Sequence, residues 1–279
     1  MKRLLIIDGH NLLFQMFFGM PARIVNKDGI AIHGVIGFVG ALNKLICRFK
    51  PSHVVALFDS QTHNPRVDIL DEYKKNRPNY EEMPDEENPF SQLRYIYSAL
   101  DAMGIVHCEI CDAETDDVIA SYALSSDNDT EIYISSFDSD FFQLISDRVR
   151  IIRYKGDSSV ICDVDYIQSK LGILPENYAD FKAMVGDSAD NIKGVAGIGK
   201  VTAAKLLSSY GSLENMLACP SIIKDEKLQA KICNSIPLIK RNVALIKLDA
   251  HAPMPFEYGD MLYRTPYIKT MEVIKKIGL

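Results

Sequence analysis

The run Leu4-Leu5-Ile6-Ile7-Asp8 is a short apolar segment of strand-forming residues that ends at an acid. The pattern returns twice, since 54–58 runs into Asp59 and 132–136 stops just before Asp138. Continuous apolar strands of this kind are typical of a parallel sheet that is covered by helices on both faces. In such sheets ligands bind beyond the carboxyl ends of the strands, so we expect these three acids to share one site.

Helical patterns lie between these strands and predict an α/β fold class. They cover about Val35–Phe49, Pro89–Met103 and Glu114–Ala123, with another strand near Ile105–Glu109. Two short strands follow at about 149–153 and 159–162, and helices then continue through 163–171, 178–185 and 237–248. We therefore predict a sheet domain over 1–162 and a helical region over 163–279.

The composition limits the class of protein. A chain of 279 residues with 47% hydrophobic content can bury one large core or two modest ones. It has no apolar run of about 18 residues and no signal-type start, so we expect a cytoplasmic protein that does not contact membranes. The six cysteines lie scattered in apolar segments, and we expect them to be reduced thiols.

The net charge of −6 is unevenly distributed along the chain. From Lys182 to Lys247, ten Lys and Arg residues stand against five Asp and Glu residues, a local balance of +5. This segment has the electrostatic character of a protein that binds a phosphate backbone. If the nine carboxylates named below are set aside, the remaining chain carries +3, so the acidity is concentrated in a site.

The segment from Thr62 to about Asn88 has no stable apolar face. It carries Arg66, the basic run 73–77 and then an acidic, proline-broken piece at 81–87. We interpret it as a mobile excursion from the sheet that carries cations over the site.

Further acids accompany those at the strand ends. Glu114, Asp116 and Asp117 crowd the first turn of a predicted helix, where three like charges repel one another unless a cation is present. A D-x-D follows at 138–140, before a helix expected near Phe141. Asp187 and Asp190 stand three residues apart, which would place them on one side if this turn is helical.

Nine carboxylates without a His or Cys neighbour at ligand spacing are candidate metal ligands: Asp8, Asp59, Glu114, Asp116, Asp117, Asp138, Asp140, Asp187 and Asp190. Hard oxygen donors favour Mg²⁺ or Mn²⁺ over zinc. Nine ligands are too many for one ion, and two ions can support an in-line displacement at phosphorus. The sequence shows no convincing Ser or Cys nucleophile, which this chemistry does not need.

A glycine hairpin at 194–199 leads directly into a predicted helix, Lys200–Leu207. Glycines let backbone N–H groups approach an anion, and a helix N-terminus directs more N–H groups at it. Because the neighbouring cations are Lys193, Lys200 and Lys205, the ligand that we expect is a phosphate.

Taken in order and spacing, these residues resemble the 5′ nuclease superfamily. The resemblance covers nearly the whole chain and rests on Asp8-Gly9, Phe58-Asp59, Arg66, Tyr73-Lys74-x-Asn76-Arg77, Glu114-Thr115-Asp116-Asp117, Asp138-x-Asp140, Gly186-Asp187-x-x-Asp190-Asn191-Ile192 and Gly197-Ile198-Gly199. The likeness is greatest to the 5′→3′ exonuclease domain at the N-terminus of bacterial DNA polymerase I and to stand-alone flap endonucleases. No polymerase portion follows, so we expect a free-standing member.

The resemblance implies a PIN-like α/β domain with a mostly parallel central sheet, a helical arch at about 62–88 and a helix-three-turn-helix at about 178–210. It implies a monomer that cleaves the 5′ strand of flapped, overhanging or branched DNA with Mg²⁺ or Mn²⁺. Asp8, Asp59, Glu114 and Asp116 would hold one metal, and the other five acids would serve the second metal or its water shell.

The resemblance also implies roles for basic and glycine residues. Lys74 and Arg77 would be catalytic cations at the scissile phosphate, Tyr73 would stack on a base, and a potassium ion is a candidate ligand of the hairpin. The full set of expected DNA contacts is Gln15, Arg66, Tyr73, Lys193, Gly194, Gly197, Gly199, Lys200, Thr202 and Lys205.

The chain departs from the family pattern at four places. Gln15 stands where relatives usually carry arginine, Phe137 replaces a glycine, Ser139 replaces a basic residue, and Lys200-Val201 replaces a glutamate-lysine pair. All nine acids remain, so we expect metal binding together with weaker stabilisation of the transition state.

Two alternative functions stay open. One is a paralogue that binds branched DNA and cuts it poorly or not at all, and the other is a PIN-type ribonuclease. An aspartyl phosphatase is disfavoured, because the first strand ends Asp8-Gly9-His10 without the second aspartate that such an enzyme uses.

Overall fold

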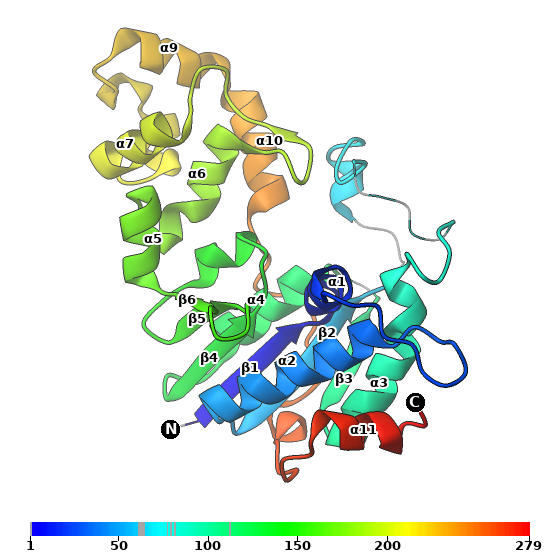
Figure 1. Ribbon diagram of the computed structural model, residues 1–279. Helices are drawn as coiled ribbons and strands as arrows, with labels where there is room; N and C mark the ends of the chain where they lie inside the picture. Colours follow the sequence, from blue (N-terminus) through cyan, green and yellow to red (C-terminus); the bar gives the residue numbers. More distant parts are fainter. Residues whose placement is uncertain (1, 61–64, 77, 79, 81, 112) are drawn as a thin grey trace.

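The central element is a six-stranded sheet with the strand order β3-β2-β1-β4-β5-β6 (Figure 1). The computed structural model describes residues 2–60, 65–76, 78, 80, 82–111 and 113–279. The strands are β1 (Lys2–Asp8), β2 (His53–Asp59), β3 (Val106–Ile110), β4 (Thr130–Ser135), β5 (Val149–Arg153) and β6 (Val160–Cys162). The pairs from β3 to β5 are parallel and β6 is antiparallel to β5, which confirms the predicted mostly parallel sheet.

The central strands β1 and β2 are largely apolar because both faces of the sheet are covered. Leu5 and Ile7 of β1 face one buried cluster and Leu4 and Ile6 face the other, as the alternation of a strand requires. The first cluster is built with α1 (Gly9–Gly19), α2 (His33–Phe49), α3 (Leu93–Met103) and α11 (Thr270–Lys276). The second is built with α4 (Thr115–Ser125) and continues into the helical region.

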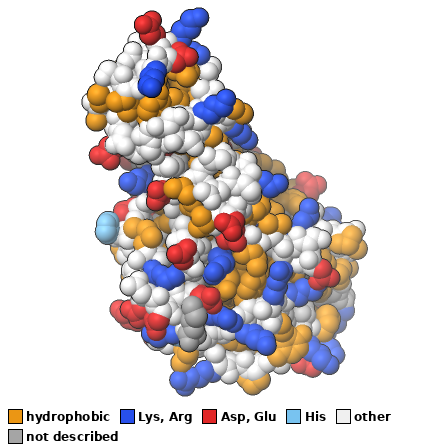
Figure 2. Space-filling view, turned by 90° about the vertical axis from the view of Figure 1, so that its left-hand side faces the viewer, with side chains coloured by type: hydrophobic (Ala, Val, Ile, Leu, Met, Phe, Trp, Pro, Cys, Tyr) orange, Lys and Arg blue, Asp and Glu red, His pale blue; other side chains and the backbone are white. Residues whose placement is uncertain are grey.

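The helical region is anchored to the sheet by a shared core. Its helices are α5 (Val164–Leu171), α6 (Tyr178–Val185), α7 (Lys200–Tyr210), α8 (Leu213–Ala218), α9 (Glu226–Asn234) and α10 (Ile236–Ile246). Ile167, Phe181 and Ile239 belong to the same buried cluster as Leu4 of β1. Figure 2 shows this narrower part above the broader sheet domain, with basic and acidic side chains interspersed on the visible face.

The connection between α6 and α7 is a compact hairpin. It contains a two-stranded ladder, β7 (Gly186–Asp187) with β8 (Ile192–Lys193), which the sequence pattern did not predict. The buried Asn242 of α10 donates from Nδ2 to the carbonyl oxygens of Ala183 (2.9 Å) and Lys193 (2.8 Å). The turn that follows α6 is therefore fixed from behind by α10.

The segment expected to form an arch crosses from the sheet to this hairpin. Within its described residues, 65–88 contain one helical element, the 3₁₀-helix η1 (Pro65–Asp68). Asn76 Nδ2 donates to the carbonyl of Ser188 (3.0 Å), and Asn191 Nδ2 donates to that of Glu72 (3.0 Å). The other described residues of this segment lie largely in turns, which these two bonds hold against the hairpin, and the bounds predicted for the arch stay a prediction.

Short 3₁₀-helices complete the fold. They are η2 (Pro89–Gln92), η3 (Asp140–Leu144), η4 (Pro175–Asn177), η5 (Pro220–Ile222) and η6 (Tyr258–Met261). The helix predicted after the D-x-D is η3, which stays short because β5 begins soon afterwards at Val149. Among the described residues, none of the helices combines the length and apolarity needed to cross a bilayer.

Gly9 should be essential for stability because a Cβ there would lie 2.3 Å from the ring of Phe58, which is fully buried. We expect Gly9→Ala to lower the free energy of unfolding by about 1–3 kcal/mol through overpacking. Gly19→Ala is the matched control, since it lies in the same helix and its Cβ would meet nothing within 4 Å. Thermal unfolding followed by circular dichroism measures both, and equal melting temperatures would contradict the packing argument.

Candidate functional site

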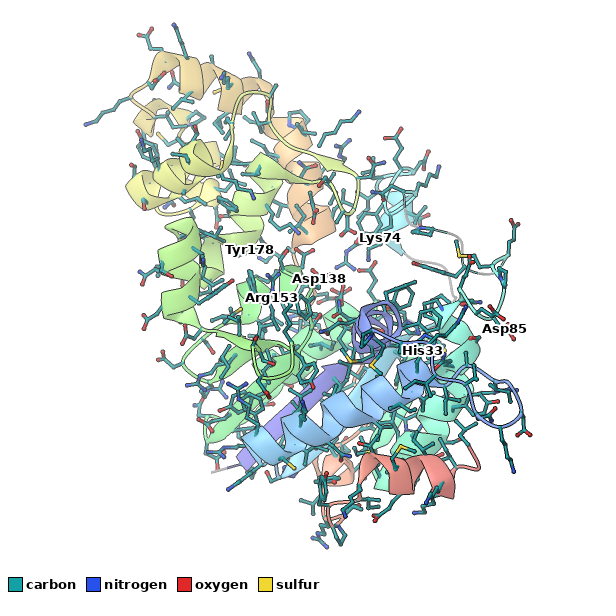
Figure 3. All side chains as sticks on the ribbon, in the orientation of Figure 1. His33, Lys74, Asp85, Asp138, Arg153 and Tyr178 are labelled. Carbon is teal, nitrogen blue, oxygen red and sulfur yellow. The ribbon has the colours of Figure 1, made fainter. Side chains whose placement is uncertain are left out.

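The parallel sheet collects acids at the carboxyl ends of neighbouring strands. Asp8 ends β1, Asp59 ends β2, Asp138 follows β4, and Asp116 lies in the first turn of α4 after β3. Because these strands are adjacent and parallel, their last residues meet at one edge. Figure 3 places Asp138 at this edge, at the waist between the sheet and the helical region.

A chain of hydrogen bonds orients the acids on β1 and β4. Asp8 accepts from the hydroxyl of Ser136 (2.7 Å) and caps α1 by accepting from the Asn11 N–H (3.2 Å). The same Ser136 Oγ accepts from the Asp138 N–H (3.0 Å), and Asp138 accepts from the Asp140 N–H (2.8 Å). The D-x-D is thereby connected to the first strand end through one buried serine, which sequence reasoning missed.

The buried acids repel one another. Burial, together with the charges of Asp59 and Asp138, raises the pKa of Asp8 to about 7, against the hydrogen bond from Ser136. Burial and the charges of Asp138, Asp59 and Asp8 raise the pKa of Asp116 well above its usual range, with Lys74 opposing. A cation between these carboxylates would relieve both the repulsion and the cost of burial.

A second acidic group faces the first across the waist. The carboxylates of Asp140, Asp187 and Asp190 each offer an oxygen, and these oxygens lie within 4.8 Å of one another. Lys182 of α6, only 6% exposed, donates its ammonium group to Asp140 and to Asp187. Burial alone would lower the pKa of Lys182, but the Asp140 carboxylate raises it, so the ammonium group stays charged.

The donor set fits hard divalent cations. The two groups together place seven carboxylates at the waist, and the three in the second group are close enough to share one ion. Carboxylate oxygens are the ligands that Mg²⁺ and Mn²⁺ prefer. The assignment of all nine acids as metal ligands stays a prediction, because the remaining two acids, Glu114 and Asp117, contact basic side chains of the protein.

Glu114 and Asp117 contact cations of the excursion between β2 and α3. Arg66 donates to both Asp117 oxygens (3.0 and 2.8 Å) and also to Glu114. Lys74 Nζ lies 3.2 Å from Glu114 Oε1, and Asp117 also accepts from the Asp249 N–H (2.9 Å). In this arrangement Asp117 joins segments of the chain, and its expected role at the second metal stays a prediction.

The predicted nucleic-acid contacts on this excursion lie in different environments. Figure 3 shows Lys74 facing the waist. Tyr73 is only 5% exposed and packs in the core, so stacking on a base would require its ring to leave this position. Arg77 lies outside the described residues.

The side chain of Gln15 is bonded to another part of the chain. Its side-chain amide donates to the carbonyl of Tyr154, on the connection between β5 and β6. The DNA contact that we predicted for Gln15 stays a prediction, and in the structure its amide links α1 to the sheet.

The hairpin presents the predicted phosphate-binding groups at the surface. Lys193, Lys200 and Lys205 are exposed, and Thr202 is partly exposed in the first turn of α7. A Cβ at Gly194 would lie 2.2 Å from the Val185 carbonyl, so this glycine is required for the close approach of two backbone segments. Gly199 has open space around it, which leaves the N-terminus of α7 accessible to an anion.

The carbonyl of Gly197 already has a cationic partner. Gly197 lies in the left-handed region (φ 74°), and its oxygen accepts from the ammonium of Lys231 in α9 (3.2 Å). The predicted potassium ion is not tested by this contact.

Sequence reasoning missed Lys182, Ser136 and His10. Lys182 carried a signal, since it is a lysine inside the apolar run Phe181–Met184. Ser136 was counted as a strand residue, although a serine at the carboxyl end of a buried strand lies where ligands bind. The ring of His10 lies next to Asp59, with Nδ1 to Oδ2 at 3.6 Å.

Fold and site together define a class of α/β proteins that carry an acidic site for hard cations beside a basic helical region. The chain belongs to the 5′-3′ exonuclease family. The profile of the 5′-3′ exonuclease N-terminal resolvase-like domain matches residues 3–172, and that of the C-terminal SAM fold matches residues 173–269.

Curated relatives support this membership. The thermostable DNA polymerase I of Thermus filiformis is 32% identical over 267 residues, covering 95% of this chain and 31% of the relative. DNA polymerase I of Bacillus caldotenax is 33% identical over 287 residues, covering 99% of this chain and 31% of the relative. The chain thus spans about a third of the length of the curated relatives that it matches.

Solved structures share the fold. A flap endonuclease of bacteriophage T5, in a pseudo-enzyme-product complex with DNA and metal ions, superimposes with a TM-score of 0.71 at 20% identity over the full length of both chains. The catalytic core of Rad2 in complex with DNA substrate gives a TM-score of 0.53 at 16% identity, over 91% of this chain and 81% of that one. At these identities the likeness shows the fold alone.

Asp116→Asn and Asp117→Asn should change stability in opposite directions in EDTA. Removing the Asp116 charge relieves repulsion, and we expect the melting temperature to rise by about 2–4 °C, equivalent to about 1 kcal/mol. Removing the Asp117 charge breaks a buried pair with Arg66 and should cost about 3 kcal/mol, or roughly 6–12 °C. Calorimetry of the metal-free proteins measures both changes. Destabilisation of the two variants by the same amount would show that Asp116 is not strained by its neighbours.

Proposed function

We propose that the protein is a structure-specific 5′ nuclease that hydrolyses DNA phosphodiesters with two Mg²⁺ or Mn²⁺ ions. The observation that supports this best is the meeting of Asp8, Asp59, Asp116 and Asp138 at one sheet edge, opposite the group formed by Asp140, Asp187 and Asp190. Ions held by these carboxylates would activate a water molecule and stabilise the leaving oxygen.

In this proposal, basic side chains of the protein balance the negative charge of the bound phosphate. Lys74 reaches the waist from the excursion and Lys182 reaches it from α6, so both can balance negative charge near a bound phosphate. Their present partners are carboxylates, which neutralise them when no DNA is bound. Arg77, which is expected beside Lys74 in this role, lies outside the described residues.

In this proposal the helical region holds the duplex. Exposed lysines lie before and along α7 (Lys193, Lys200 and Lys205), and the N-terminus of this helix offers backbone N–H groups that can bind phosphate without reading sequence. The catalytic unit would be 1–162 and the DNA-binding unit 163–279, acting as a monomer on DNA with a 5′ flap, overhang or branch.

The second candidate is a protein that binds branched DNA with little or no cleavage. The side chain of Gln15 favours it, because its amide is occupied by the Tyr154 carbonyl and supplies no charge to the site. Family membership and the retained acids favour the nuclease.

One assay separates the functions. A 5′-labelled flap duplex, a blunt duplex and a single-stranded RNA are each incubated with and without Mg²⁺. We expect Mg²⁺-dependent cleavage near the flap junction, and Asp116→Asn should abolish the cleavage while flap binding in EDTA is retained. Binding without cutting would support the branched-DNA binder, and cutting of RNA alone would support the ribonuclease.

Lys200→Ala tests the duplex-binding surface. Loss of one phosphate contact should weaken binding regardless of sequence and reduce the slope of log affinity against log salt by about one. Lys44→Ala on α2 is the control, because Lys44 is also exposed but belongs to the sheet domain. A salt series of binding titrations measures both slopes, and an unchanged slope for Lys200→Ala would place this residue outside the interface.

A further inference from the structure

A cavity of about 540 Å³ lies between the C-terminal end of α1 and the excursion that follows β2. Its wall includes Phe17 and Phe18 of α1, Arg23, His33 at the start of α2, and Tyr80 and Met83 of the excursion. Figure 3 shows His33 at the end of α2 that lies nearest to the excursion carrying Asp85. A volume of this size is in the range of sites that hold small organic ligands.

A row of aromatic rings joins this cavity to the acids. His10, Phe14 and Phe18 follow one another at intervals of four residues on one face of α1, with ring centroids 6.5 and 6.1 Å apart. His10 Nδ1 lies 3.6 Å from Asp59 Oδ2, and Phe18 lines the cavity. Tyr80 packs against Phe14 (5.1 Å) and against Phe18 (6.3 Å). The row is therefore continuous from the acidic site to the cavity.

The length of this row can be compared with the length of a short stretch of nucleotides. At about 1.5 Å per residue, His10 and Phe18 are about 12 Å apart along the helix axis. Stacked nucleotides rise by about 3.4 Å each, so this distance corresponds to about three or four of them.

The lining favours a nucleobase over a phosphate. Glu86 and Glu87 also line the cavity, and Arg23 is already paired with Glu86 (Nη1 to Oε2, 2.9 Å), so a phosphate would meet carboxylates without a free cation in the described wall. Phe18 is 59% exposed beside this cavity, although an aromatic ring is costly to leave in water. A flat, uncharged base would cover this ring and avoid the repulsion.

His33 adds a polar group to the same wall. It is 5% exposed, and its Nδ1 has no hydrogen-bond partner within the described part of the chain. Burial and the neighbouring Arg23 lower the pKa of His33. A neutral histidine ring can accept a hydrogen bond, and the amino and ring N–H groups of bases are suitable donors.

We propose that this cavity binds a nucleobase of the single-stranded 5′ segment of the DNA, about three or four nucleotides from the cut. The proposal rests on the proposed function, because it assumes that the scissile phosphate lies at the acids. The base would stack on Phe18 and Tyr80, and such stacking tolerates all bases. Since a paired base is not free to enter, the cavity would favour substrates with an unpaired 5′ segment.

An abasic scan tests the proposal. A duplex with a 5′ flap of about six nucleotides, longer than the row of rings, is prepared with one abasic nucleotide at each flap position in turn. Binding is measured in EDTA, so that cleavage plays no part. We expect an abasic nucleotide three or four positions from the cut to weaken binding about tenfold, equivalent to about 1.4 kcal/mol. Abasic nucleotides at the other flap positions should weaken binding less.

Phe18→Ala should reproduce this loss on the intact flap and add nothing on the abasic flap that shows it. Because Phe18 is already 59% exposed, its truncation should leave the fold intact, which circular dichroism checks. Tyr267→Ala is the matched control, since Tyr267 is an aromatic residue of similar exposure (60%) outside the cavity. It should bind the flap like the wild type.

Three outcomes would overturn the proposal. The first is an abasic scan in which no flap position changes the binding affinity. The others are an equal loss of affinity for Phe18→Ala on a blunt duplex, and a loss of affinity that depends on a 3′ single strand and not on the 5′ flap. Cleavage of the flap duplex by the wild type with Mg²⁺ is measured in parallel. A flat scan with normal cleavage would reject the cavity and leave the nuclease function standing. A position-specific scan without cleavage of any DNA would reject the nuclease function and retain the cavity.

Discussion

Mutual repulsion between carboxylates at the carboxyl edge of the sheet is the constraint on which the rest of the structure depends. The parallel order of β3, β2, β1 and β4 forces acids that are far apart in sequence to meet there. Burial then raises the pKa of Asp8 to about 7 and that of Asp116 well above its usual range. The fold tolerates this concentration of charge because cations surround it, and a divalent ion is the partner that the donors fit.

The cations come from segments that lie outside the sheet. Arg66 and Lys74 approach from the excursion after β2 and contact Asp117 and Glu114, while Lys182 approaches from α6 between Asp140 and Asp187. The excursion also binds the hairpin through Asn76 and Asn191. Charge balance at the acids thus couples the excursion, the sheet and the helical region, so a change at one set of these ion pairs affects all three parts.

Much of the architecture follows from the sequence pattern, although its finer parts do not. The apolar runs that end at Asp8 and Asp59 gave both the parallel sheet and the position of the acids, since strand order does not change which end of a strand carries the acid. The pattern predicted α6 with the bounds that the structure has, Tyr178–Val185. It did not predict the turns that the described residues of the excursion form, or the burial of the Tyr73 ring, because both depend on contacts with distant residues.

The sequence by itself determined which residues can carry chemistry, because carboxylate, ammonium and glycine backbone groups keep their properties in any fold. Only the tertiary structure decided how they pair. Asp116 and Asp117 are adjacent in the chain, yet one faces the other acids and the other is held by Arg66, because neighbouring helical residues point about 100° apart. The contacts of the Gln15 amide and of the Phe18 ring also depend on the tertiary structure, because both side chains meet residues distant in sequence that no local pattern encodes.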